Sequence, residues 1–132
     1  MKLGALLVIN AILAAAFGIA FVIAPAQLLS MYGIAVTPGT TVVSRLFGAS
    51  LLGYASLTWQ VRDLPDSTPL RAILYALFAS DIIGLIISIS GQLSGAVNGL
   101  GWLTVAIYLF LSAGYGYFAF KKPSAVPAAP SP

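Results

Sequence analysis

The pattern of apolar and polar positions divides the chain into four long apolar runs, separated by short segments rich in polar residues, glycine and proline. The runs cover residues 3–24, 41–61, 70–90 and 97–120. At a rise of ~1.5 Å per residue, a helix of about 20 residues reaches ~30 Å, the thickness of a bilayer's hydrocarbon core. The pattern therefore predicts an all-α fold, a bundle of four transmembrane helices.

Short segments between the runs carry signals for helix ends. Pro25 ends the first run, and residues 26–32 have the composition of a short helix lying at the membrane interface. Ser67 or Thr68 is placed to cap the third helix, with Pro69 at its first position.

Residues 1–122 thus form a single expected domain, a four-helix transmembrane domain. The first run is preceded by Lys2, but it has no charge in 22 residues and is longer than the ~7–15 residues of a signal-peptide core, so we expect it to be retained. Residues 123–132, a tail rich in proline and alanine, are expected to be extended or disordered.

Composition supports a membrane protein. The chain of 132 residues is 60% hydrophobic and 7% charged, whereas soluble domains are roughly 45–50% apolar and about 25% charged. A soluble fold of this length could not bury so much apolar surface. The net charge of +3 comes from scattered residues, so no basic stripe indicates nucleic acid.

The distribution of charge predicts the orientation. With four crossings both termini lie on one side, and the segments on the opposite side, 25–40 and 91–96, carry no charge. The positive-inside rule therefore places both termini in the cytoplasm. The basic residues on the cytoplasmic side are Lys2, Arg62, Arg71, Lys121 and Lys122.

The chain has no His, Cys or Glu. The usual thiolate and imidazole metal sites, haem ligation by histidine and nucleophilic catalysis by Ser–His or Cys–His pairs are thereby excluded. We expect no catalytic residues, no metal site and no cofactor, and a protein that is not an enzyme.

One acid stands in the middle of an apolar run. Asp81 is the only charge between Arg71 and Lys121, and an ionised Asp at a bilayer centre costs about 2.5–3.5 kcal/mol on insertion scales. Arg45 is the candidate partner by depth, and Tyr108 lies at a similar depth to donate a hydrogen bond. Three interpretations stay open: a structural Arg45–Asp81 ion pair, a proton or substrate site, and a protonated Asp81 with Arg45 extending to the lipid headgroups.

Small residues at helical spacing predict the packing faces, because close approach through small side chains drives helix association in lipid. In the second run the expected inward stripe is Arg45, Ala49, Gly53, Ser56 and Gln60. The glycines expected at helix contacts are Gly18, Gly48, Gly53, Gly84 and Gly116.

The segment 44–53, SRLFGASLLG, resembles small bacterial four-span proteins of the broad DoxX-like group, in which an arginine starts the second span and glycines follow. Arg45, Gly48 and Gly53 carry the resemblance. It implies a four-helix bundle in the inner membrane, and some members of the group resemble subunits of quinone-linked sulfur oxidation. The lack of His and Cys leaves redox chemistry without support in this chain.

Three functions follow as hypotheses. The first is a non-catalytic accessory or structural subunit that packs against other membrane proteins or against copies of itself. The second is a small oligomeric transporter that uses Asp81 and Arg45. The third is a quinone- or lipid-binding membrane subunit of an oxidoreductase, with Arg45 and Tyr108 as polar contacts.

Overall fold

A computed structural model describes residues 1–122, which form five α-helices and no strand. The expected tail, 123–132, lies outside the described residues. All four apolar runs are helical, with ends shifted by a few residues. The helices are α1 (Leu3–Ile23), α2 (Pro25–Met31), α3 (Pro38–Val61), α4 (Thr68–Leu93) and α5 (Gly101–Phe120).

Three of the helices, α1, α4 and α5, are long and apolar enough to cross a membrane. Helix α3 has 24 residues, but it is the least apolar of the four long helices because it contains Arg45, Gln60 and several hydroxyl side chains. The structure thus establishes an all-α protein with three candidate spans.

Local signals set the helix ends. The Thr37 hydroxyl accepts a hydrogen bond from the Thr40 amide at 3.1 Å, the Thr37 amide donates to the Thr40 hydroxyl at 2.8 Å, and Pro38 opens α3. This reciprocal cap satisfies backbone donors that the first turn leaves free. Ser67 caps α4, which confirms the first of the two expected capping residues. The short helix expected over residues 26–32 is α2, which begins at Pro25 and ends at Met31.

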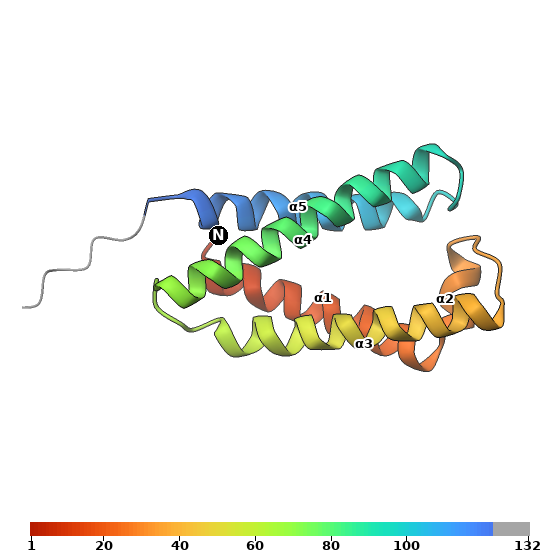
Figure 1. The fold of residues 1–132 in the computed structure, drawn as a ribbon, viewed down its shortest axis with the longest axis horizontal. Helices are drawn as coiled ribbons and strands as arrows, with labels where there is room; N and C mark the ends of the chain where they lie inside the picture. The colour runs from red at the N-terminus through yellow and green to blue at the C-terminus, as the bar shows by residue number, and fades with distance from the viewer. Residues whose placement is uncertain (123–132) are drawn as a thin grey trace, which may run out of the picture.

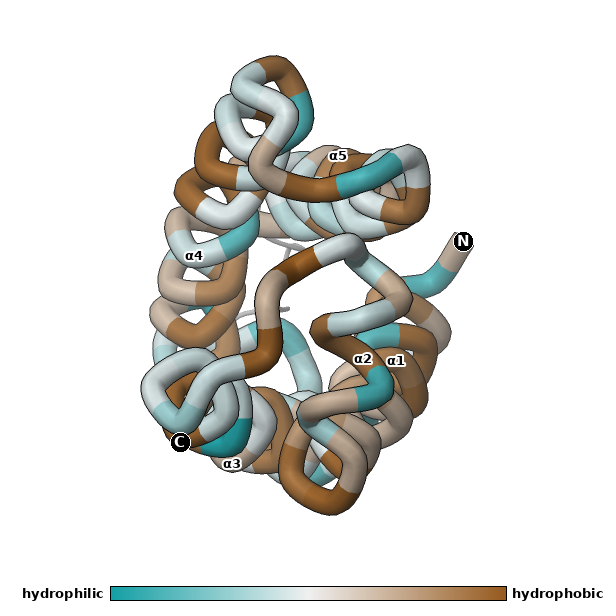
Figure 2. The backbone as a smooth tube through the Cα atoms, turned by 90° about the vertical axis from the view of Figure 1, so that its right-hand side faces the viewer, coloured by the Kyte–Doolittle hydropathy of each residue, from teal (hydrophilic) through white to brown (hydrophobic). Residues whose placement is uncertain are grey.

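The long helices form two antiparallel pairs. Helix α1 packs along α3, and α4 packs along α5. Figure 1 shows the two pairs close together at the end that holds the N-terminus and the α3–α4 loop, and farther apart at the end that holds α2. Figure 2, viewed from the α2 end, shows α4 and α5 above α1 and α3, with brown apolar segments on the outside of the bundle.

The main hydrophobic core lies at the end where the pairs meet. It is built from the start of α1, the end of α3, the start of α4 and the end of α5. Tyr115 is fully buried there, and Leu70, Leu74 and Leu77 of α4 are almost completely buried. The remaining members are Leu6, Leu7, Val61, Leu111, Phe118 and Ala119.

The inward face of α4 explains why the core stops halfway. Its inward positions follow one another at intervals of three and four residues, which keeps them on one side of a helix. Leucines occupy the first three of these positions, and an acid, two glycines and a serine occupy the rest, so the side-chain volume falls along the helix. In order, the positions are Leu70, Leu74, Leu77, Asp81, Gly84, Ser88 and Gly91.

Glycines allow the helices to approach. A Cβ atom built on Gly48 would lie 2.8 Å from the Gly18 carbonyl oxygen, and one on Gly18 would lie 3.0 Å from the Gly48 carbonyl oxygen. A Cβ on Gly84 would lie 2.3 Å from the ring of Tyr108. These three glycines therefore sit at helix contacts, as expected.

Of the two remaining glycines expected at helix contacts, one lies at a contact and the other does not. Gly116 also faces a neighbour, since a Cβ there would lie 2.9 Å from the ring of Phe78. Gly53 is exposed, with nothing within 4 Å of a Cβ built on it, so its assignment to a packing face is wrong.

The stripe expected on the second run is wrong for the same reason. All five of its members are exposed, and α3 instead buries Ser44, Gly48, Ala55, Thr58 and Val61. Both faces of α3 carry small residues at helical spacing, and the face that contains Gly48 is the one that meets α1.

Hydrogen bonds of Arg71 connect elements at the core end of the bundle. The Arg71 guanidinium donates to both carboxylate oxygens of Asp66, each at 2.9 Å. It also donates to the backbone carbonyls of Ala119 at 3.2 Å and Lys121 at 3.0 Å. Arg71 therefore links the start of α4 to the end of α5.

Candidate functional site

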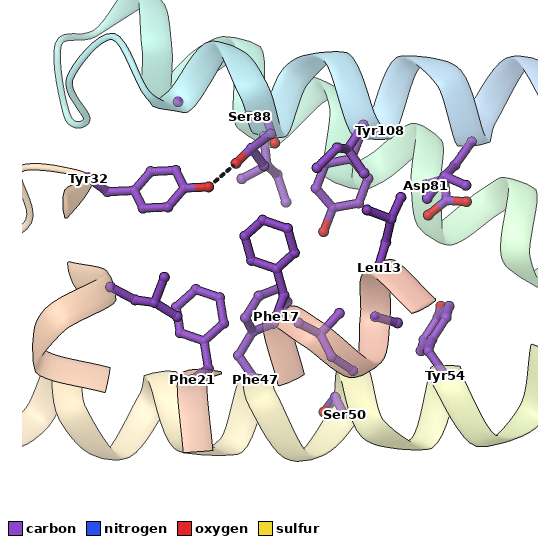
Figure 3. Close-up of a pocket in the computed structure, with 18 of the residues that line it drawn as sticks. Leu13, Phe17, Phe21, Tyr32, Phe47, Ser50, Tyr54, Asp81, Ser88 and Tyr108 are labelled. Atoms are coloured by element: carbon purple, nitrogen blue, oxygen red, sulfur yellow. Dashed lines mark hydrogen bonds between the residues drawn. The ribbon is translucent and has the colours of Figure 1, made fainter. Parts of the chain in front are cut away.

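A cavity of about 380 Å³ occupies the half of the bundle that the core does not fill. All five helices contribute to its wall, which is mostly apolar. Figure 3 shows Phe17, Phe21 and Phe47 extending into it from one side and Tyr108 from the other. Ligand-binding cavities in proteins span roughly 300–1,000 Å³, so this one is large enough for a small molecule.

Hydrogen bonds join different elements of the chain near both ends of the cavity. At the core end, the Asn10 side chain donates to the Tyr115 hydroxyl at 2.8 Å, in a buried position between α1 and α5. At the opposite end, the hydroxyls of Tyr32 and Thr104 share a hydrogen bond of 2.8 Å (Figure 3). The Asn98 amide nitrogens also bond to backbone carbonyls at the end of α2.

The cavity opens sideways. Among the residues that line it, the exposed ones are Phe47 and Ser50 on α3 and Ile87 on α4. Phe47 is 42% exposed and Ile87 is 65% exposed. The mouth thus lies between α3 and α4, on a lateral face of the bundle, where a membrane-spanning protein meets lipid tails.

Asp81 lies at the deep end of this cavity, one helical step beyond Leu77. Its side chain is only 4% exposed, and Figure 3 shows the carboxyl pointing into the cavity. The carboxyl oxygen Oδ2 is buried and has no hydrogen-bond partner. A buried polar group without a partner loses its hydration without replacement, so natural structures contain few of them and each calls for an explanation.

The expected ion pair between Arg45 and Asp81 is not formed. Arg45 is exposed on α3, and no ion pair joins it to Asp81 in the part of the chain that the structure describes. Phe47 faces the cavity, and a position two residues away on a helix is rotated by about 200°. Arg45 therefore points away from the cavity. Counting residues gave a plausible depth for the pair but said nothing about rotation around the helix axis.

Tyr108 and Asp81 do line the same cavity, as their similar depth predicts, although no hydrogen bond joins them. The ring of Tyr108 lies over Gly84, the residue one turn along α4 from Asp81. Tyr54 of α3 adds a second hydroxyl to the same region (Figure 3). The arrangement offers a carboxyl and two phenol groups around an apolar space.

Sequence reasoning missed the aromatic side chains of this wall. Phe17 and Phe21 of α1 and Phe47 of α3 line the cavity, and the rings of Phe21 and Phe47 meet edge to face with centroids 5.3 Å apart. The signal was present as heptad-like spacing. Leu7, Asn10, Ala14, Phe17 and Phe21 follow one another at intervals of three and four residues along α1.

Within residues 1–122 no group of acidic, histidine or cysteine side chains is placed to hold a metal ion. The chemistry of the site is therefore that of an apolar chamber with a few polar groups. Comparisons with known proteins add no relative: no protein-family model, no curated protein and no solved structure matches this chain.

Proposed function

We propose that the protein binds an amphiphilic small molecule that enters its cavity sideways from the bilayer. The observation that carries the proposal is the lateral mouth between α3 and α4, which leads to a largely apolar chamber with Asp81 at its deep end. A molecule dissolved among lipid tails reaches such a mouth without passing through water. A few convergent polar groups in an apolar pocket are typical of sites that orient a small ligand.

The hypotheses drawn from the sequence have less support. The third, a quinone- or lipid-binding subunit of an oxidoreductase, used Arg45 as a polar contact, but Arg45 does not line the cavity. The apolar outer faces of the helices fit an accessory subunit, but a bilayer alone requires the same faces. A transporter needs a route to both sides, whereas the packed core fills the bundle at one end of the cavity. A ligand that enters from the lipid needs only the lateral mouth between α3 and α4.

The proposal includes four crossings, with α3 as one of them and both termini in the cytoplasm. Helix α3 packs along α1, a candidate span, and its 24 residues reach ~36 Å at ~1.5 Å per residue. The charged residues Lys2, Arg62, Arg71 and Lys121 belong to one end of the bundle (Figure 1). The opposite end, formed by α2 and the turn after α4, carries no charge. This asymmetry fits the positive-inside rule.

The topology is tested by cysteine labelling, because the chain has no Cys of its own. We expect single-cysteine variants at Lys2 and Asp63 to be protected from a membrane-impermeant maleimide in intact spheroplasts, and a variant at Ser94 to react. If α3 did not cross, Lys2 and Asp63 would lie on opposite sides and only one of them would react.

Ligand binding is tested by blocking the mouth. Ser50→Trp places a large side chain at the opening, and Ala49→Trp places the same side chain on the neighbouring exposed position, which does not line the cavity. Protein in lipid nanodiscs is extracted with organic solvent, and the small molecules retained per protein are measured by mass spectrometry. We expect wild type and Ala49→Trp to retain a compound that Ser50→Trp lacks. Equal amounts in all three would contradict a binding site in this cavity.

A further inference from the structure

Among the described residues that line the cavity, Asp81 is the one aspartate, and no glutamate, lysine or arginine joins it. No lysine or arginine lines the cavity, and the nearest expected cation, Arg45, lies on the outer face of α3. The hydrogen-bonding potential of Oδ2 is unused although the residue is 4% exposed. The protein thus holds an acid in an apolar chamber without supplying a counter-charge.

Aromatic rings surround the space in front of this carboxyl. Tyr54 of α3, Tyr108 of α5 and Phe17 of α1 line the same cavity as this carboxyl (Figure 3). The faces of such rings attract a cation within about 6 Å, an interaction worth ~2 kcal/mol or more when it is shielded from water. A carboxylate and a group of ring faces favour the same sign of ligand charge.

We propose that the ligand is an amphiphilic organic cation, a lipophilic amine whose ammonium group pairs with Asp81. This inference rests on the proposed binding function and names the ligand class for the same site. The ammonium donates to the Asp81 carboxyl, and the apolar part of the molecule lies against Phe17, Phe21 and Phe47 toward the mouth between α3 and α4. The amine supplies the counter-charge that the protein lacks at this position.

Other ligand classes fit the wall less well. A fatty acid or another anion would meet Asp81 with like charge in a region of low dielectric constant, where repulsion is strong. A quinone presents carbonyl oxygens, which accept hydrogen bonds, so Tyr54, Tyr108 and a protonated Asp81 could serve it, but it carries no positive charge for the ring faces to attract. A bare metal ion would find one carboxyl where several oxygen ligands are needed.

The test compares two probes of the same chain length, dodecylamine and dodecanol, in phosphatidylcholine nanodiscs. Binding is measured by equilibrium dialysis, and the signal of Ser50→Trp nanodiscs is subtracted to remove partitioning into lipid. We expect wild type to bind dodecylamine at least about tenfold more tightly than dodecanol, as for a buried charge pair. Asp81→Asn should remove this preference, and Asp63→Asn, the same change at an exposed loop position, should keep it.

The outcomes separate the two proposals. If both probes bind wild type with equal affinity and Ser50→Trp abolishes the binding of both, the inference of a cationic ligand is overturned and the binding function stands. If neither probe shows binding that depends on an open mouth, both proposals are overturned. The comparison of the two probes on wild type needs no variant at Asp81. It can therefore overturn the inference even if Asp81→Asn folds poorly.

Discussion

The contact between Gly18 and Gly48 should decide whether α1 and α3 hold together, and Gly48→Ala tests this directly. The added Cβ would lie 2.8 Å from the Gly18 carbonyl oxygen and 2.9 Å from the Cβ of Phe21, whereas ordinary contact begins near 3.4 Å. Neither atom can move away by rotation of a side chain, because one is a backbone oxygen and the other is a Cβ. The helices therefore have to separate along their contact.

Two effects of opposite sign set the magnitude. Extra volume in a well-packed interface costs about 1–3 kcal/mol. Alanine also stabilises a helix by up to ~1 kcal/mol relative to glycine. We therefore expect a net loss of roughly 1–2 kcal/mol in the free energy of unfolding. Gly53→Ala is the matched control on the same helix, since nothing lies within 4 Å of a Cβ at that position.

The assay is the loss of helical circular dichroism as sodium dodecyl sulfate is titrated into protein held in a mild detergent. The unfolding midpoint should fall for Gly48→Ala and should stay the same or rise for Gly53→Ala. Equal midpoints for the two variants would refute the close approach of α1 and α3 at Gly48. A lower midpoint for Gly53→Ala alone would mean that the opposite face of α3 is the packed one.

Further predictions use the same assay or the dialysis measurement. Asn10→Ala leaves the buried Tyr115 hydroxyl without its 2.8 Å partner and should destabilise by about 0.5–2 kcal/mol, the range of hydrogen bonds between membrane helices; an unchanged midpoint would contradict the bond. Arg71→Ala should lower the midpoint more than Arg62→Ala, because only Arg71 links α4 to the end of α5. Arg45→Gln should change the unfolding free energy by less than ~0.5 kcal/mol and leave dodecylamine binding intact, since Arg45 is exposed and points away from Asp81. A loss of dodecylamine binding as large as that caused by Asp81→Asn would instead support an Arg45–Asp81 ion pair. Gly84→Ala should displace the Tyr108 ring into the cavity and weaken dodecylamine binding, whereas Gly53→Ala should leave it unchanged.

The helices and their caps were predictable because their causes are local. Length and apolarity set each run, and Ser67 and Pro69 mark the start of α4 whatever the rest of the chain does. The rotation of α3 was not predictable in this way. Its two faces carry similar small residues, and only the fit of Gly48 against Gly18 on another helix selects between them.

The cavity was harder still to predict, because it depends on the inward faces of all five helices at once. Asp81 stood out in the sequence as an intramembrane acid, and the search for its partner by depth led to Arg45. The face of α4 that holds Asp81 also holds Leu74 and Leu77, at intervals of four and three residues. Reading that face as a series would have placed Asp81 inward and shown that the large residues end just before it.

The position of Asp81 relative to the core bears on what the carboxyl is for. A structural polar group that sets helix register gains most when it is enclosed by packed neighbours and bonded to one of them, as Asn10 is bonded to Tyr115. Asp81 is enclosed and lines the cavity, but its buried oxygen Oδ2 has no hydrogen-bond partner. An apolar side chain at this position would extend the leucine face by one step and avoid the desolvation of an acid. The protein keeps the acid at the first inward position where the core ends and the cavity begins, and this placement favours a group that meets something entering through the mouth over one that only fastens the bundle.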